Sequence, residues 1–330
     1  MGDVTEHEVR TRVWRNGTVE AENFPFEQIS DYLEEPDCLV WADLCAPDQA
    51  RLEALAEELS LDPHAVEDAV ERRERPKASR YATHMFLAAY EIRLDRETGE
   101  LHTSQVSAFV MKRAFVTVRQ SEYFDLDPVV TTWDENADLM KYGPKALVHG
   151  LLDVLVDGHF AAIEALDDET EKIEDILFEE TRATVRQVQI RSFALRKSLV
   201  EARRVILPMR ELVSAVMRRA DDLHPELEPY YDDLYDHVLR AAEWTESLRD
   251  MISSIFETNL SLADSRLNSI MKKLTGWAAI IAVPTAVTGF YGQNVPYPGF
   301  GAHWGFWVST LVMIAMSLGL YLVFRRRDWI

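Results

Sequence analysis

Hydrophobic residues are spread unevenly along this chain of 330 residues. From Leu274 to Phe324, 51 consecutive residues include no Asp, Glu, Lys or Arg. Prolines and glycines within 294–303 divide this run into apolar stretches at 274–291 and 304–324. Since a helix crosses a bilayer with about 20 apolar residues, segment 274–324 is predicted to form two transmembrane helices joined by a short outer loop, 292–303. For the first stretch, which contains Thr and Pro, a buried soluble helix is the alternative.

A helical pattern leads into the first apolar stretch. Between Asp232 and Thr275 there is no Pro or Gly, and apolar residues recur at steps of mostly three and four. This pattern predicts one helix from about residue 230 to about 291, roughly 90 Å long at 1.5 Å per residue. A helix of this length needs neighbours, so self-association is expected.

The N-terminal part has a different pattern. Short alternating or β-rich stretches predict strands at Cys38–Leu44, His84–Ile92, Val106–Lys112 and Phe115–Arg119. Helices are predicted between them at Asp48–Leu59 and Pro63–Glu74, and everything after Pro144 reads as helical. We therefore expect an α+β protein with a first domain at 1–143 and a helical region with a long stalk at 144–273.

Charge sets the expected orientation in the membrane. Lys272 and Lys273 precede the first apolar stretch, Arg325, Arg326 and Arg327 follow the second, and the connecting loop has no basic residue. Because basic residues favour the cytoplasmic side, both termini, including the basic tail 325–330, are expected in the cytoplasm.

The overall composition excludes several classes of protein. The net charge is −21, and an acidic surface repels nucleic acid and attracts cations. Cys38 and Cys45 fit no common zinc motif and are expected to be buried, reduced thiols. The N-terminus has no apolar core, so no cleaved signal peptide is expected.

One face of the first apolar helix is small, partly polar and uncharged. It comprises Asn268, Met271, Thr275, Ala278, Ala282, Thr285 and Gly289, and it extends to Gly292-Gln293-Asn294. Small residues in a membrane helix can mean only close helix packing. The alternative is that this row lines a pore, which several chains would have to enclose together because two helices per chain cannot.

The chemistry of the row suits a hydrated cation. Mg²⁺ loses water reluctantly and usually keeps several water ligands. Amide, hydroxyl and carbonyl oxygens, such as those of Asn294, Gln293 and Thr285, can hold such an ion. A fixed carboxylate in a pore could bind it too tightly for release.

These residues resemble a known family. The segment "TGFYGQN" is similar to the Gly-Met-Asn signature of the CorA-type divalent metal ion transporters, and "VEDAVERRERPK" at 66–77, the stalk "YYDDLYDHV" and the terminal basic cluster fall in the family order. The resemblance implies a funnel-shaped homopentamer in the cell membrane, with an N-terminal cytoplasmic α/β/α domain, a stalk helix that becomes the inner membrane helix, and an outer second helix.

The resemblance also implies roles for residues of the row. Gly292, Gln293 and Asn294 correspond to the selectivity filter. Asn268, Met271 and Leu274 correspond to the cytoplasmic half, where apolar rings gate the pore, whereas Ala282 is smaller than the family's second constriction. Thr285 and Gly289 correspond to the outer half, and Thr275 and Ala278 lie on the same face. Gln293 replaces the usual Met, and the loop lacks the family's acidic residue, so the metal preference is open.

Cytoplasmic acids could sense the transported metal. In the family, acids corresponding to Asp68 and Asp233 meet across subunits and bind regulatory Mg²⁺, with Glu67, Asp157 and His237 as weaker candidates. A bound divalent ion would bridge these like charges and hold the ring closed. The alternative is that they are solvated helix faces.

The function expected from these patterns is passive Mg²⁺ uptake driven by the membrane potential, with Co²⁺ and Ni²⁺ tolerated. No ATP-binding motif is present. Transport of Zn²⁺, as in a related branch, is the first alternative. A membrane-anchored metal-dependent hydrolase using Asp232, Asp233, Asp236 and His237 is more distant, since phosphate-loop, G-x-S-x-G and HExxH motifs are missing. An anchored adaptor would need no polar membrane row. The expected partners are copies of the same chain, membrane lipid and divalent cations.

Overall fold

The computed structural model describes residues 9–70, 75–177, 182–218, 223–293 and 295–330. The chain forms two compact units, one extending to Ile255 and one comprising Phe256–Ile330. Helix α7 (Glu228–Tyr291) is continuous and contributes to both. The long helix predicted at about 230–291 is therefore confirmed, and its length follows from the absence of Pro and Gly before the apolar stretch.

A mixed sheet lies at the centre of the first unit. The described residues form seven strands in the order β2-β1-β3-β7-β6-β5-β4. Only the central pair, β3 and β7, is parallel, with Val40 opposite Ala114; the other neighbours are antiparallel. The strands are β1 (Val9–Arg15), β2 (Thr18–Glu22), β3 (Cys38–Cys45), β4 (Lys77–Arg80), β5 (Met85–Leu94), β6 (Leu101–Val110) and β7 (Ala114–Arg119).

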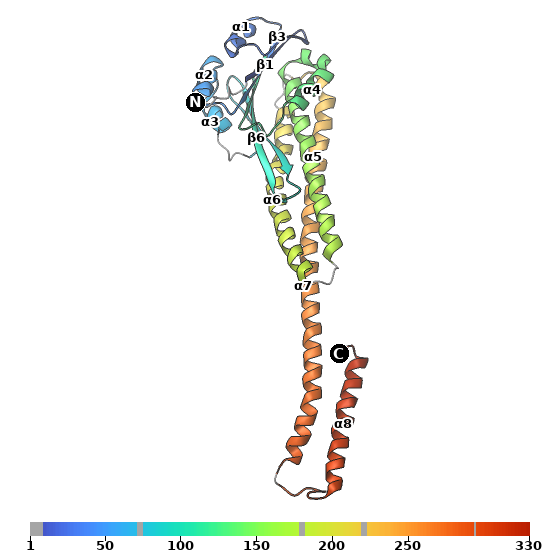
Figure 1. The fold of residues 1–330 in the computed structure, drawn as a ribbon. Coiled ribbons are helices and arrows are strands. Elements are labelled where there is room, and N and C mark those ends of the chain that lie inside the picture. The colour runs from blue at the N-terminus through green and yellow to red at the C-terminus, as the bar shows by residue number, and fades with distance from the viewer. Residues whose placement is uncertain (1–8, 71–74, 178–181, 219–222, 294) are drawn as a thin grey trace. The chain divides into compact units, whose positions relative to one another are not determined.

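Helices cover both faces of this sheet (Figure 1). One face packs on α1 (Ile29–Glu34), α2 (Gln49–Glu58) and α3 (Pro63–Val70) through a core that includes Leu52, Leu55 and Phe109. The other face packs on α4 (Asp127–Glu135), α5 (Pro144–Leu177), α6 (Arg182–Arg218) and the start of α7 through a core that includes Trp133 and Leu151. The expected α/β/α arrangement is confirmed. Short 3-10 turns lie at Phe26–Gln28, Ala137–Tyr142 and Pro225–Leu227.

The centre of the sheet holds a buried ion pair. Arg119 Nη2 donates to Asp43 Oδ2 at 2.7 Å, and Thr117 Oγ1 donates to the other carboxylate oxygen at 2.6 Å. Arg119 Nη1 donates to the carbonyl of Phe124 at 2.7 Å. A buried charge is tolerated only when it is paired and hydrogen-bonded, so this network fixes the parallel pairing of β3 with β7.

Within the described residues, three helices are long and apolar enough to cross a membrane. They are α5, α7 and α8 (His303–Arg326), but 61% of the most apolar window of α5 is buried inside the fold, against 11% for α7 and none for α8. The apolar face of α5 is therefore accounted for by the core of the first unit. The membrane candidates are the end of α7 and α8, the two stretches predicted from the sequence.

Candidate functional site

Helix α8 packs along one stripe of α7 in the second unit. Gly276 and Val283 are the buried positions in the apolar part of α7, at 274–291. A Cβ atom on Gly276 would lie 3.1 Å from Ile330 at the C-terminus, and the ring of Trp277 lies 6.5 Å from that of Tyr321. The absence of a side chain at Gly276 thus lets Ile330 approach α7 closely.

The row singled out from the sequence lies on a different face of α7. Thr285 follows Val283 by two residues, which is about 200° around a helix. Ala278, Ala282, Thr285 and Gly289 are all exposed, and so are Asn268 and Thr275 further back. Packing of α7 against α8 within one chain therefore does not explain these small residues. Close packing between chains and the lining of a pore both remain compatible with the exposed row.

Apolar side chains extend this exposed face toward residue 268. Met271 is 51% exposed and Leu274 is 62% exposed. Exposed apolar side chains in a contiguous row indicate an interaction surface. In a single chain these two side chains are uncovered, as expected if the positions meet their equivalents from other copies around a closed ring.

The hydroxyl of Thr285 is oriented by its own helix. Thr285 Oγ1 donates to the carbonyl of Ile281 at 3.2 Å. A hydroxyl has a single hydrogen and two lone pairs, so the oxygen is left as an acceptor on an exposed face. Water molecules around a cation present their hydrogens outward, and this acceptor suits a hydrated cation.

The end of α7 leads directly into the predicted filter. Gly292 N donates to the carbonyl of Thr288 at 2.8 Å, and Gln293 N donates to that of Phe290 at 3.3 Å. A Cβ atom on Gly292 would lie 3.0 Å from the carbonyl oxygen of Thr288, so glycine suits this tight turn. Gly292 and Gln293 are exposed. Asn294 lies outside the described residues.

The loop after the predicted filter is held by aromatic rings and glycines. The hydroxyl of Tyr297 donates to the carbonyl of Tyr291 at 3.3 Å, and the ring centroids of these residues are 4.9 Å apart. A Cβ atom on Gly305 would lie 2.5 Å from the carbonyl oxygen of Gly299, closer than any real contact. The start of α8 can therefore approach the loop only because residue 305 has no side chain.

Asp68, the first of the predicted regulatory acids, is already paired. It lies on α3, and its Oδ2 accepts a hydrogen bond from Lys77 Nζ on β4 at 2.8 Å. The Asp68 side chain is 19% exposed and that of Lys77 is 28% exposed. A metal ion at Asp68 would compete with this lysine. Reasoning from the sequence missed Lys77, although it ends the quoted segment 66–77.

Three further candidates lie where α5 and α7 meet. Asp233 on α7 is exposed, and its Oδ2 is 3.9 Å from His237 Nε2. The ring of His237 contacts Phe160 of α5, with centroids 6.1 Å apart. Burial and the nearby charge of Asp153 raise the pKa of Asp157, and His237 partly offsets this. The structure thus brings Asp157 and Asp233 near the same histidine.

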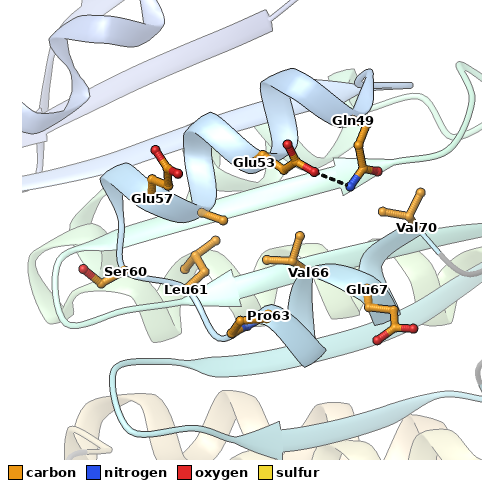
Figure 2. A pocket seen from close by; sticks show the side chains of 10 residues that line it. Gln49, Glu53, Glu57, Ser60, Leu61, Pro63, Val66, Glu67 and Val70 are labelled. Atoms are coloured by element: carbon orange, nitrogen blue, oxygen red, sulfur yellow. Dashed lines mark hydrogen bonds between the residues drawn. The ribbon is translucent and has the colours of Figure 1, made fainter.

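Glu67 faces a different environment. It lines a groove of about 770 Å³ between α2 and α3, whose apolar lining includes Leu61 and Val66 (Figure 2). Glu53 and Glu57 of α2 line the same groove, and Glu53 Oε1 accepts a hydrogen bond from the side chain of Gln49 at 2.9 Å. Glu67 therefore shares this groove with two acids of α2.

One chain does not assemble these acids into a metal site. Across the part of the chain that the structure describes, no group of three or more His, Cys, Asp or Glu side chains is arranged to hold a metal ion. This applies also to the cluster of Asp232, Asp233, Asp236 and His237 that suggested a hydrolase. Among the described residues of one chain, Asp68 and Asp233 therefore belong to no such group.

The three-layer domain, the continuous α7 and the helix α8 that follows it, with the end of α7 and α8 apolar enough to cross a membrane, define a membrane protein. The family described as CorA-like Mg²⁺ transporter protein matches residues 37–326. The chain therefore belongs to this family. It is a divalent cation transporter and not an enzyme.

Individual relatives agree with this assignment. The chain is 30% identical to the cobalt/magnesium transport protein CorA of Thermotoga maritima, over 84% of this chain and 80% of that protein. It is 29% identical to the putative metal ion transporter YfjQ of Bacillus subtilis, over 93% and 94%. The solved structure of the complete CorA magnesium transporter from Methanocaldococcus jannaschii matches with a TM-score of 0.76 at 20% identity, covering 98% of each chain, and shows the same fold.

Proposed function

We propose that this protein mediates passive Mg²⁺ uptake along the exposed row of α7, with Co²⁺ and Ni²⁺ as further substrates. The observation that supports this proposal best is that the row is uncharged, uncovered by α8, and carries the outward acceptor oxygen of Thr285. Gly292, Gln293 and Asn294 at its end would hold the hydrated ion before it enters. Neutral oxygens bind an ion weakly enough to release it.

The membrane potential is a sufficient driving force. Moving one charge across the membrane is worth about 2.3 kcal/mol per 100 mV, so a divalent cation gains about 4.6 kcal/mol. With an inside-negative potential the ion moves inward without ATP. The acidic cytoplasmic domain favours the arrival of cations on that side.

Several chains must form the pathway together. In this proposal each chain contributes the end of α7 and α8 as its spanning helices, and α8 leaves the row of α7 uncovered. Copies arranged in a closed ring, five in the proposed homopentamer, would place these rows around a common axis and bury Met271 and Leu274 among their equivalents. Those two apolar positions would form the gate.

Regulation by cytoplasmic Mg²⁺ would use Asp68 and Asp233 from adjacent chains, assisted by Glu67, Asp157 and His237. Mg²⁺ would displace Lys77 from Asp68 and bridge the carboxylates, which stabilises the closed ring. When internal Mg²⁺ falls, repulsion between the acids loosens the ring and the gate widens.

The proposed orientation follows the charges at the ends of the spans. The termini lie in the cytoplasm, with Lys272, Lys273 and the arginines of the tail on that side of the cell membrane. The domains in this proposal are 1–143, 144–273, the membrane segment 274–324 and the tail 325–330.

Zn²⁺ transport is the second candidate. The row includes no Cys or His, the ligands that favour a dehydrated transition metal. Hydrated Mg²⁺ therefore suits the row better, and parallel flux measurements with both metals separate the two candidates.

The test of the pathway is to narrow it at one position. Ala278→Leu places a larger side chain on the row, and Ala315→Leu makes the same change on an exposed position of α8. We expect Ala278→Leu to reduce Mg²⁺ flux into proteoliposomes at least about tenfold, because a hydrated ion needs the full width, and Ala315→Leu to leave it unchanged. Equal flux in the two variants would place the pathway elsewhere.

A further inference from the structure

A cationic cleft lies in the first unit, far along the sequence from the ion pathway. It has a volume of about 560 Å³ and is lined by three segments: 80–85 after β4, 110–112 after β6, and 142–145 at the entry to α5. Its lining includes Arg80, Lys112 and Lys145 and no acidic residue. In a chain with a net charge of −21, a cleft whose charged lining residues are all basic indicates an anionic ligand.

Two of these cations lie at the rim of the cleft without a partner among the described residues. Among the described residues, the side chains of Arg80 and Lys112 make no hydrogen bond or ion pair, and both are exposed at the rim. Elsewhere in the unit, basic side chains such as Lys77 and Arg15 pair with nearby acids. The guanidinium and ammonium groups at the cleft are therefore available to an anion.

The start of α5 adds a third source of positive potential. This helix of 34 residues begins at Pro144, which lines the cleft. A helix N-terminus has a partial positive charge and favours phosphate groups. The dipole of α5 therefore acts together with Arg80 and Lys112.

A buried histidine at the cleft lacks a hydrogen-bond donor. His84 lines the cleft, is only 4% exposed, and its Nε2 has no hydrogen-bond partner among the described residues. Thr83 Oγ1 donates its single hydrogen to the carbonyl of Ser60 at 2.9 Å, so it accepts from His84 Nδ1, also at 2.9 Å. Burial lowers the pKa of His84, although Asp62 partly offsets this. The neutral ring thus keeps Nε2 as an acceptor that lacks a donor.

Aromatic rings complete the lining. Tyr81 stacks on His84 with ring centroids 5.1 Å apart, and Tyr142, from the segment 142–145, also lines the cleft. The ring of Tyr142 already stacks on His224, with centroids 4.3 Å apart, and Lys141 lies 4.9 Å from its centre. Tyr81 is therefore the ring that the cleft offers to a planar group.

We propose that this cleft binds a nucleoside di- or triphosphate. The phosphates contact Arg80, Lys112 and the start of α5; a hydroxyl or amino group of the nucleoside donates to His84 Nε2; and the base lies against a tyrosine. A simple anion could bind Arg80, Lys112 and the start of α5, but it supplies no hydrogen-bond donor for His84 Nε2. The cleft volume falls in the range of small-ligand sites, roughly 300–1,000 Å³.

Binding is tested by calorimetry on the full-length protein in detergent, after dialysis against EDTA so that chelation of metal by the ligand contributes no heat. The ligands are ATP, ADP, pyrophosphate and adenosine. The variants are Arg80→Gln and Lys112→Gln, with Arg191→Gln, an exposed arginine of α6, as the matched loss of charge. We expect ADP and ATP to bind more tightly than pyrophosphate or adenosine. Each cleft variant should weaken nucleotide binding about tenfold, the effect of one lost charge-assisted hydrogen bond.

Each possible result either supports or overturns the proposed nucleotide binding. No nucleotide binding by the wild-type protein, or equal weakening by Arg191→Gln, would overturn the proposal. Equal affinities for pyrophosphate and ADP would overturn the nucleoside part, because the donor to His84 would then be dispensable. Tight nucleotide binding that only the cleft variants weaken supports it.

Discussion

Lys77 gives the sharpest test of the proposed metal regulation. Its ammonium group is 2.8 Å from the carboxylate of Asp68, and both side chains are mostly buried. The substitution Lys77→Gln removes the positive charge that competes with Mg²⁺ for this carboxylate. Regulatory Mg²⁺ should then bind more tightly, and the transporter should close at a lower internal Mg²⁺ concentration.

The size of this effect follows from the geometry of the pair. Two unit charges 2.8 Å apart attract by about 6 kcal/mol at an effective dielectric constant of about 20. Desolvation and the ordering of a long side chain offset most of this, which leaves about 1 kcal/mol net. The Mg²⁺ concentration for half-inhibition should therefore fall about fivefold.

The assay is Mg²⁺ flux into proteoliposomes at a series of internal Mg²⁺ concentrations. Lys172→Gln is the matched control, because Lys172 also pairs with an acid, Glu169 on α5. This variant should leave the half-inhibiting concentration unchanged. Asp68→Asn should raise that concentration, because it removes a ligand. An unchanged value in Lys77→Gln together with a raised value in Asp68→Asn would refute competition by the lysine, and unchanged values in both would remove Asp68 from the regulatory site.

Three further outcomes are expected. Arg119→Met leaves the carboxylate of Asp43 buried without its partner and should lower the free energy of unfolding by about 3–5 kcal/mol, as measured by denaturant titration. Gly305→Ala should lower the flux of every divalent ion, because its Cβ meets a backbone oxygen at 2.5 Å, whereas Gly319→Ala in open space should not. Burial lowers the pKa of His159 from 6.5 to about 4, so the unfolded chain binds more protons between these values and the unfolding free energy should fall by up to about 3 kcal/mol as the pH drops from 6.5 to 4. His159→Gln should flatten that slope.

The two apolar helical segments and the stalk were predictable because their signals are long and local. An uncharged run and an unbroken helical period each extend over many residues, and the structure places α7 and α8 within a few residues of the predicted bounds. The buried strands β3, β5 and β7 were also found, since their apolar or alternating runs face the two cores. For the helix predicted at Pro63–Glu74, the described part ends at Val70.

The missed elements have weak local signals. β2 and β4 are short edge strands with mostly exposed or half-buried residues, so no apolar alternation marks them. β1 includes three arginines and no regular alternation, and Arg12 is nevertheless buried, where Asp134, distant in sequence, pairs with it at 2.8 Å. Such a partner appears only once the chain has folded.

In the candidate site, too, local patterns were predictable and contacts between distant elements were not. The row of small residues on α7 could be read from helical spacing, but which face α8 covers depends on packing, and the structure leaves the row uncovered. The lysine beside Asp68 and the unpaired Nε2 of His84 depend on contacts between separate elements. The role of Gly292, Gln293 and Asn294 as a filter stays a prediction from the sequence, and Asn294 lies outside the described residues.

The most direct test of the account is Mg²⁺ influx into proteoliposomes under an inside-negative potential, with Co²⁺ and Zn²⁺ in parallel. We expect Mg²⁺ influx that grows with the potential and is lost in Asn294→Ala, while the variant remains folded. Zn²⁺ influx without Mg²⁺ influx would contradict the proposed substrate, and undiminished Mg²⁺ influx in Asn294→Ala would contradict the proposed filter.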